Sequence, residues 1–222
     1  MGASLDFSAV SDALPALLYG CLGTIGLSLA GMGLALTIGV FGVLARRSRH
    51  APIRLATLAF VEIIRNTPFL VQIFFLFFAL PATGIRLNPT TTAILALGLN
   101  GGAYAIEIIR GGVQSIQRGQ TEAGLALGLH AGQVFRLVVL KPALRAIWPS
   151  LSSQFVMLTL TSSICSSVAA YELTSVAQRI ESDTFRSFEI YFTITLLYLI
   201  ISWLVMSAFA LVSRQFLAYP LR

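Results

Sequence analysis

The segment that decides the fold is EIYFTITLLYLIISWLVMSAFALVS, which runs from Glu189 to Ser213. After Glu189 it contains no charged side chain. A helix needs about 20 predominantly apolar residues to cross the hydrocarbon core of a bilayer, which is about 30 Å thick. This segment therefore predicts a membrane-spanning α-helix.

Four further apolar runs precede this segment, and the composition of the chain agrees with them. The chain has 222 residues, of which 56% are hydrophobic and 11% charged, and its mean hydropathy is +0.84. One soluble core could not hide that much apolar surface. We predict an all-α integral membrane protein, a single domain over residues 1–222 with five transmembrane helices at about 15–44, 55–80, 90–109, 149–170 and 189–213. The first run is long enough to tilt or to project from the bilayer.

Basic residues indicate the orientation of the chain in the membrane. Loops on the cytoplasmic side carry an excess of Lys and Arg. The loop after the first span, the segment after the third span and the C-terminal end contain Arg46, Arg47, Arg49, Arg54, Arg110, Arg118, Arg136, Lys141, Arg145, Arg214 and Arg222. The opposite loops contain only Arg86, Arg179 and Arg186. The N-terminus is therefore expected outside and the C-terminus inside a multi-pass cell membrane.

Several classes of function find no support in the sequence. The net charge of +6 lies in short loops and forms no extended stripe, which argues against nucleic-acid binding. The cysteines Cys21 and Cys165 lie in apolar runs, and His50 and His130 lack metal-site spacing, so we expect no metal. The chain contains no G-x-x-x-x-G-K-[ST] phosphate loop and no catalytic constellation, so we expect no enzyme activity of its own.

Small residues mark possible contact faces between helices. They are Gly20, Gly23 and Gly26 in the first span, and Gly98 and Gly102 in the third. Spacings of this kind let helix backbones approach closely in lipid. We expect these faces to pack, although ordinary glycine content of membrane helices is an equally good explanation.

The inner loop, about residues 119–148, has the pattern of two short helices joined by a turn. Thr121 can cap a helix whose first turn holds Glu122, where a negative charge suits the helix dipole. Gly128 permits a break before the apolar and basic stretch from Gln133 to Leu140. The alternative is a loop that serves only as an anchor at the membrane interface.

The loop sequence resembles a known motif. Glu122-Ala123-Gly124, then Gly128, then Val138-Val139-Leu140 is similar to the coupling loop of binding-protein-dependent ABC importer permeases. Their pattern is Glu-Ala-Ala, three residues, Gly, nine residues, an aliphatic residue, one residue and Leu-Pro. Two positions depart from it: Gly124 stands for the second Ala, and Lys141 stands for Pro, with Pro142 one place later.

Other segments resemble the branch of this family that handles histidine, glutamate, glutamine, arginine and opines. They are Gly20 with Thr24, Arg65-Asn66-Thr67-Pro68 followed by Leu70-Val71-Gln72, and Tyr171-Glu172-Leu173-Thr174. The resemblance implies a type I importer fold in a bacterial inner membrane. It also implies an external solute-binding protein, a second permease subunit and an ATPase dimer that binds ATP-Mg, with no cofactor in this chain. The residues that it implies for contact with the ATPase are Glu122, Ala123, Gly124, Gly128 and Leu129.

Polar residues within the apolar spans are candidates for binding the solute. A charge at the centre of a bilayer costs about 2.5 to 3.5 kcal/mol on insertion scales, so such residues usually face a cavity or a partner. Pro68 has no amide hydrogen and leaves the carbonyl of Ile64 without its helical partner. We expect Arg65 to hold the carboxylate of an amino acid, and Glu172 or Glu62 to hold its amine or a cationic side chain. The full set of candidates is Glu62, Arg65, Asn66, Thr67, Gln72, Asn100 and Glu172.

Structural roles for these residues remain open alternatives. Glu62 and Arg65 lie three residues apart and could form an ion pair on one helix face. Asn100 could hydrogen-bond to a neighbouring helix. At the level of the whole chain, the alternative is a gradient-driven secondary transporter or channel subunit, which would predict repeats with paired broken helices. The sequence leaves open which amino acid is carried and whether the second permease subunit is identical.

Overall fold

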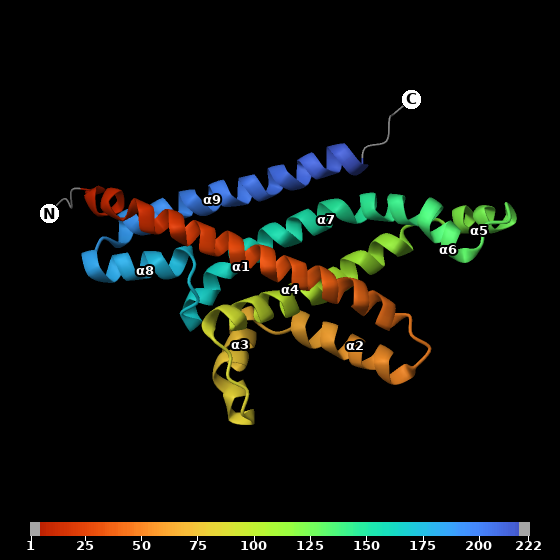
Figure 1. Cartoon of the computed structure of the whole chain (residues 1–222), viewed down its shortest axis with the longest axis horizontal. Coiled ribbons are helices and arrows are strands. Elements are labelled where there is room, and N and C mark those ends of the chain that lie inside the picture. Colours follow the sequence, from red (N-terminus) through yellow and green to blue (C-terminus); the bar gives the residue numbers. More distant parts are fainter. Residues whose placement is uncertain (1–4, 218–222) are drawn as a thin grey trace.

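The computed structural model describes residues 5–217 as an elongated bundle of helices (Figure 1). Arg222 and both chain ends of the expected 1–222 domain lie outside these residues. The long helices are α1 (Ser8–Arg46), α4 (Pro89–Gln114), α7 (Leu140–Thr161) and α9 (Ser187–Val212). Each belongs to a helical run that is long and apolar enough to cross a membrane, and a bent pair supplies a fifth candidate. The prediction of five spans is therefore confirmed if the bent pair counts as one.

The pair formed by α1 and α4 is the most extensive helix contact in the described structure. A Cβ atom at Gly98 would overlap Leu34 of α1, and one at Gly102 would lie 2.6 Å from a methyl group of Ile38. Gly20 and Gly23 likewise approach the segment 171–173 closely. The prediction that these glycines mark contact faces is confirmed. Gly26 takes no part in such a contact within this chain, because no neighbouring atom lies within 4 Å of the position that a Cβ would take there.

The second expected span, 55–80, is not one straight helix. Helix α2 (Ala51–Arg65) and the helical segment 69–83 are bent by 112° at a short break. This segment consists of α3 (Phe69–Phe74), a π-helical turn η1 (Phe75–Ala79) and a 3-10 turn η2 (Leu80–Thr83). It projects sideways from the bundle (Figure 1). The break lies at Pro68, because proline interrupts the hydrogen-bonding of a helix.

The inner loop forms two short helices, as expected. Helix α5 (Arg118–Ala126) is followed by Gly128 with φ +84, and α6 (Ala131–Val134) begins after it. The expected cap is wrong: Gln117 is the residue before α5, and Thr121 lies inside the helix, which places Glu122 in its second turn. The helix begins at Arg118, four residues before the start that a cap at Thr121 would give, and none of the residues from Arg118 to Thr121 is a proline that would prevent it.

The helix after the loop starts far before the expected residue 149. A continuous helical run extends from Ala131 through the π-helical turn η3 (Phe135–Val139) and α7, and ends in the 3-10 segment η4 (Ser162–Val168). In η3 the Leu140 amide donates to the Phe135 carbonyl, five residues back. This wider turn lies just before Pro142, which has no amide hydrogen to donate to the Val138 carbonyl four residues back.

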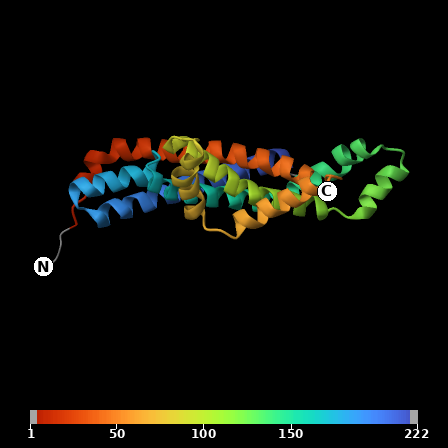
Figure 2. The same cartoon turned by 90° about the horizontal axis from the view of Figure 1, so that it is seen from below.

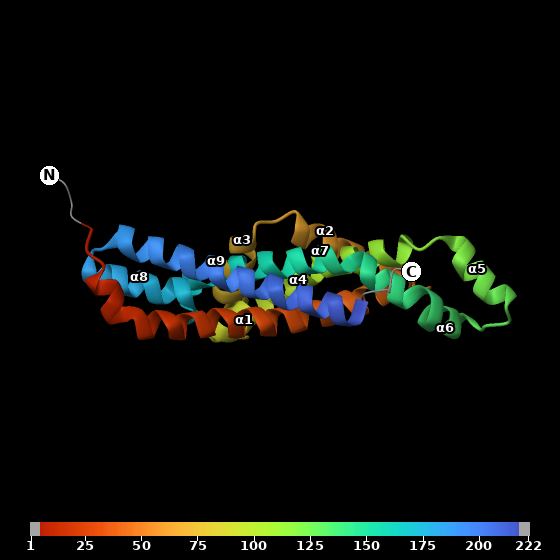
Figure 3. The same cartoon turned by 90° about the horizontal axis from the view of Figure 1, so that it is seen from above.

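The two ends of the bundle differ in character. Helix α8 (Leu173–Thr184), which falls in a region expected to be loop, packs beside α1 at the end where α1 begins. Helices α5 and α6 project at the opposite end (Figures 2 and 3). Helix α9 starts near α8 and runs toward the α5–α6 end, where it continues into the π-helical turn η5 (Ser213–Leu217). The described chain therefore begins at the α8 end of the bundle and finishes toward the α5–α6 end. An odd number of membrane crossings requires such an arrangement.

Candidate functional site

The break between α2 and α3 brings together several of the expected solute-binding residues. Gln72 Nε2 donates to the carbonyl of Ile64 at 2.7 Å and also contacts Thr67 Oγ1 at 2.9 Å. Gln72 Oε1 accepts a hydrogen bond from Asn100 Nδ2 of α4 at 3.0 Å. Pro68 leaves the Ile64 carbonyl without its helical donor, and the Gln72 side chain supplies a donor in its place. We call Thr67, Gln72 and Asn100 the Gln72 cluster.

Arg65 lies at the end of α2 and does not pair with Glu62. Its guanidinium carbon lies 5.3 Å from the centre of the Tyr104 ring on α4, a cation–π arrangement. Glu62 instead accepts a hydrogen bond from Asn66 Nδ2 at 3.1 Å, and the same nitrogen donates to the Glu62 carbonyl at 2.8 Å. The alternative of a Glu62–Arg65 ion pair is absent from residues 5–217. Arg65 remains exposed, with donors available to a ligand.

Glu172 is far more enclosed than a solute contact would require. Its side chain is fully buried and caps α8: Ser175 N donates to Oε1 at 2.6 Å and Thr174 N to Oε2 at 2.8 Å. Tyr198 of α9 also donates to Oε2 at 2.7 Å. Burial raises the pKa of the Glu172 carboxyl, while these hydrogen bonds act in the opposite direction. A solute role for Glu172 stays a prediction, and this geometry favours a structural role.

Two of the family-like motifs meet in space. The Thr24 hydroxyl of α1 accepts a hydrogen bond from the Leu173 amide at 3.1 Å. A Cβ atom at Gly23 would lie 2.7 Å from the Tyr171 carbonyl oxygen. Thr24 and Leu173 are both buried. The motif at 20–24 and the motif at 171–174 therefore form one packed joint between α1 and the start of α8.

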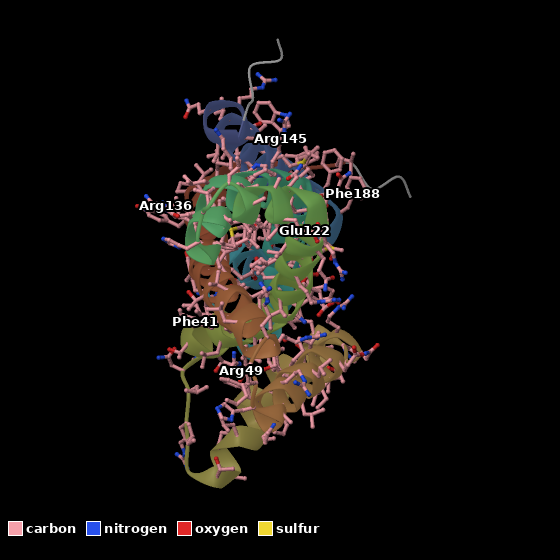
Figure 4. The ribbon with its side chains drawn as sticks, turned by 90° about the vertical axis from the view of Figure 1, so that its right-hand side faces the viewer. Phe41, Arg49, Glu122, Arg136, Arg145 and Phe188 are labelled. Carbon is pink, nitrogen blue, oxygen red and sulfur yellow. The ribbon has the colours of Figure 1, made fainter. Side chains whose placement is uncertain are left out.

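The α5–α6 loop presents a small apolar and acidic surface. Glu122 and Ala123 are exposed, and Figure 4 shows Glu122 on the end of the molecule that faces the viewer. Leu129 is half-buried, and its amide donates to the Gly124 carbonyl at 3.2 Å. Gly124 is buried against Val134 of α6, where an added Cβ would lie 3.0 Å from a methyl group. The small size of Gly124 thus permits this close packing inside the loop, and an added Cβ would need Val134 to shift slightly. Contact with an ATPase stays a prediction for this set.

A match to a family model covers most of this architecture. Residues 38–217 match the model for the binding-protein-dependent transport system inner membrane component. The chain belongs to this family. The permease family has its ATPase on a separate subunit, and its members are multi-pass proteins of the inner membrane.

Individual relatives extend the permease likeness over nearly the whole chain. The glutamine transport system permease protein GlnP of Escherichia coli (strain K12) is 39% identical over 199 residues, which cover 89% of this chain and 91% of the relative. The L-cystine transport system permease protein TcyB of Bacillus subtilis (strain 168) is 36% identical over 81% of this chain and 77% of its own length. The nopaline transport system permease protein NocM of Agrobacterium fabrum is 31% identical over 90% and 88%.

Solved structures agree with the fold of this permease. A chain from the crystal structure of an amino acid ABC transporter with histidines has a TM-score of 0.89 and 30% sequence identity, and the match covers 96% of this permease and 100% of that chain. A chain of the MetNI methionine ABC transporter in an inward-facing conformation has a TM-score of 0.73 at 20% identity, over 91% and 97%. The prediction of a type I importer permease fold is confirmed.

Sequence reasoning missed some residues that shape both sites of this permease. Leu127 lies next to Gly128 at the tip of the loop, and 82% of its surface is exposed, so it is an apolar side chain available for contact. Glu107 of α4 binds Arg46 of α1 at 3.1 Å and also pairs with Arg110, which ties the two helices together near the loop. An isolated leucine before a turn glycine carries little signal, and the Arg46–Glu107 pair joins residues too far apart in the sequence to be inferred.

Replacing Gln72 with methionine is expected to destabilise the break between α2 and α3. The change keeps the length of the side chain but leaves the Ile64 carbonyl and the Asn100 amide without their partner. An unpaired group costs about 1–3 kcal/mol when it is buried, and these two groups are half-buried, so the lower end of that range is expected for each. Thermal unfolding in detergent measures the loss. Asn100→Leu is the matched control, because it removes only the Asn100 contact and should cost less. Equal unfolding temperatures for wild type and Gln72→Met would contradict the bridging role.

Proposed function

We propose that this permease subunit forms, together with a second permease subunit, the translocation pathway of an ATP-driven importer of polar amino acids. The observation that carries the proposal is the likeness over nearly the full chain to permeases named for glutamine, cystine and nopaline transport. These solutes all carry an α-amino-acid group. The exposed Arg65 next to the Gln72 cluster offers a cation and amide groups suited to it.

Arg65 is the residue that we assign to the carboxylate of the solute. A guanidinium group has its donors in a planar fork that matches a carboxylate in two-point contact. The ring of Tyr104 holds the guanidinium from one face and leaves its edge free. Glu62 and Asn66 lie within one turn of Arg65 and are both exposed, so they supply oxygen acceptors for the amine.

The α5–α6 loop is the segment that we assign to ATPase contact. It continues without a long connector into the helical run from Ala131 to Val168, which crosses the bundle. If the closing ATPase dimer displaces the loop, this helical run would move with the loop as a rigid element and carry the displacement into the bundle. Glu122, Ala123 and Leu127 lie exposed on the loop for such contact, and ATP-Mg would be bound by the ATPase.

The orientation follows from the same assignment. The α5–α6 end would lie in the cytoplasm with the C-terminus, as the arginine-rich loops predict. The N-terminal end of α1, with α8 beside it, would face outward toward a solute-binding protein. Helix α1 has 39 residues and is about 58 Å long at about 1.5 Å per residue, so it projects beyond a core of about 30 Å.

Uptake by the complete transporter tests the proposal. Cells that express this chain with its partner ATPase and binding protein should accumulate labelled glutamine, arginine, histidine, glutamate or cystine in an ATP-dependent manner. Arg65→Ala should lower that uptake about 10- to 100-fold, since a charged hydrogen bond contributes about 1.5–3 kcal/mol. Arg54→Ala is the matched control, because Arg54 is an exposed arginine on the same helix.

Two results would contradict these assignments in different ways. Unchanged uptake in the Arg65→Ala variant would remove Arg65 from the solute site while leaving the importer function intact. Uptake that persists when ATP is depleted and stops when ion gradients are collapsed would instead favour the gradient-driven alternative. Insertion of each variant is checked by its amount in isolated membranes.

A further inference from the structure

A cavity of about 920 Å³ lies where α1 and α4 end and the α5–α6 loop begins. Its walls come from four parts of the chain: the end of α1, the end of α4, helix α5, and the run formed by α6 and η3. The Arg46–Glu107–Arg110 contacts lie beside it. None of the solute-site candidates in α2 and α3 contributes to its lining.

The polar part of the lining is strongly basic. Four arginines, Arg46, Arg47, Arg110 and Arg118, face one carboxylate, that of Glu122. Glu107 partly neutralises two of them, Arg46 and Arg110, and holds them in place. Arg47 and Arg118 are exposed and form no ion pair among residues 5–217. The lining therefore includes two arginines without an ion-pair partner among residues 5–217, one directly after α1 and one at the start of α5.

The remaining lining is apolar. Val43 of α1, Val113 of α4, Leu125 of α5 and Phe135 with Val139 of η3 contribute to it. A small inorganic anion would contact only the arginines and would leave the apolar wall without a partner. An amphiphile can place its anionic head against the arginines and its hydrocarbon chain against the apolar wall. The cavity also lies where α1 and α4 end, which is on the cytoplasmic side in the orientation proposed above.

We propose that this cavity binds an anionic phospholipid. Its phosphate lies between Arg46, Arg47 and Arg118, and its acyl chain lies along the apolar wall. Basic pockets between transmembrane helices on the cytoplasmic side are suited to lipid headgroups of this kind. The bound lipid would join the end of α1 to helix α5 and so brace the loop that we assign to ATPase contact. Its binding does not depend on which solute is carried.

Binding of labelled lipid to the purified transporter complex tests this inference. The probes are fluorescent cardiolipin and phosphatidylglycerol, with phosphatidylcholine as the neutral control, titrated into the complex in mild detergent. The double variant Arg47→Gln/Arg118→Gln should bind the anionic lipids about 30-fold more weakly, since each arginine near an anionic lipid contributes about 1 kcal/mol. The matched control is Arg49→Gln/Arg136→Gln, which removes two exposed arginines that do not line the cavity.

Three outcomes are distinguishable. Selective loss of anionic-lipid binding in the cavity variant, with the control variant unchanged, supports the proposal. Equal loss in both variants, or equal binding of phosphatidylcholine, overturns it, because the attraction is then unspecific. Displacement of the lipid by inorganic phosphate at low concentration, in the absence of nucleotide, overturns the lipid assignment and shows that the cavity takes a soluble phosphate compound. Gel filtration of each variant confirms that the complex is assembled before it is titrated.

Discussion

Replacing Gly98 with valine is expected to abolish the folded permease. The backbones of α1 and α4 approach so closely here that even a Cβ at Gly98 would overlap the side chain of Leu34. Valine adds two further methyl groups, and overpacking of a helix interface costs about 1–3 kcal/mol or more. In lipid, close packing is itself a main source of helix association. The amount of folded protein extracted in mild detergent, and its unfolding temperature, measure the effect.

Gly33→Val is the matched control for this prediction. Gly33 lies in α1 as well, but no atom lies within 4 Å of its Cβ position. The same substitution there should leave the yield and the unfolding temperature close to wild type. If both variants behave alike, the cause is the β-branched residue in a helix, and the close α1–α4 contact has no special importance.

Replacing Gly128 with valine is expected to disconnect ATP hydrolysis from transport while the chain still inserts in the membrane. Gly128 has φ +84, in the left-handed region, where a residue with a side chain costs roughly 1–2 kcal/mol. The turn between α5 and α6 would open and shift Glu122 and Leu127 away from their positions at the tip. Solute-stimulated ATP hydrolysis by the complex in proteoliposomes should fall at least about tenfold.

Two further variants distinguish the effect of the turn conformation at Gly128 from the effect of the exposed side chains on the loop. Gly119→Val changes an exposed glycine of α5 that has a negative φ and open space around it, and it should retain coupling. Glu122→Ala leaves the turn intact and should reduce coupling, because it removes the exposed carboxylate. Normal uptake in the Glu122→Ala variant would exclude Glu122 from ATPase contact.

The sequence predicts the spans and the loop because their signals are local. Apolar length identifies each crossing, and Gly128 marks the turn of the loop through a backbone conformation that glycine favours. Pro68 likewise predicts a broken helix and an orphaned carbonyl at Ile64. The sequence does not predict how that carbonyl is satisfied, because Gln72 reaches it only after the 112° bend places α3 across the end of α2.

Tertiary contacts explain the features that local sequence signals do not predict. Glu172 is a charged residue in an apolar region, which favours a solute contact, but the fold buries it as the cap of α8. Helix α8 has a local signal, because Leu173, Val176, Ala177 and Ile180 follow helical spacing after the capping residue Glu172. Its position in the fold, however, depends on the close approach of Gly20 and Gly23 to its first residues. Thr121 is a good capping residue, yet the helix begins at Arg118. Neither burial nor the exact start of a helix is determined by local preference.

Isolation of the tagged chain with its partners tests whether it works as the membrane subunit of an ATP-driven importer, with the α5–α6 loop as the point of contact. The chain is purified in mild detergent from its own host, its partners are identified by mass, and ATP hydrolysis is assayed. We expect recovery of an ATP-binding cassette ATPase that hydrolyses ATP with the wild-type chain, and solute-stimulated hydrolysis at least about tenfold lower in the complex when Gly128 is changed to valine. Reproducible isolation of the chain with no nucleotide-hydrolysing partner would show that the proposed function is wrong.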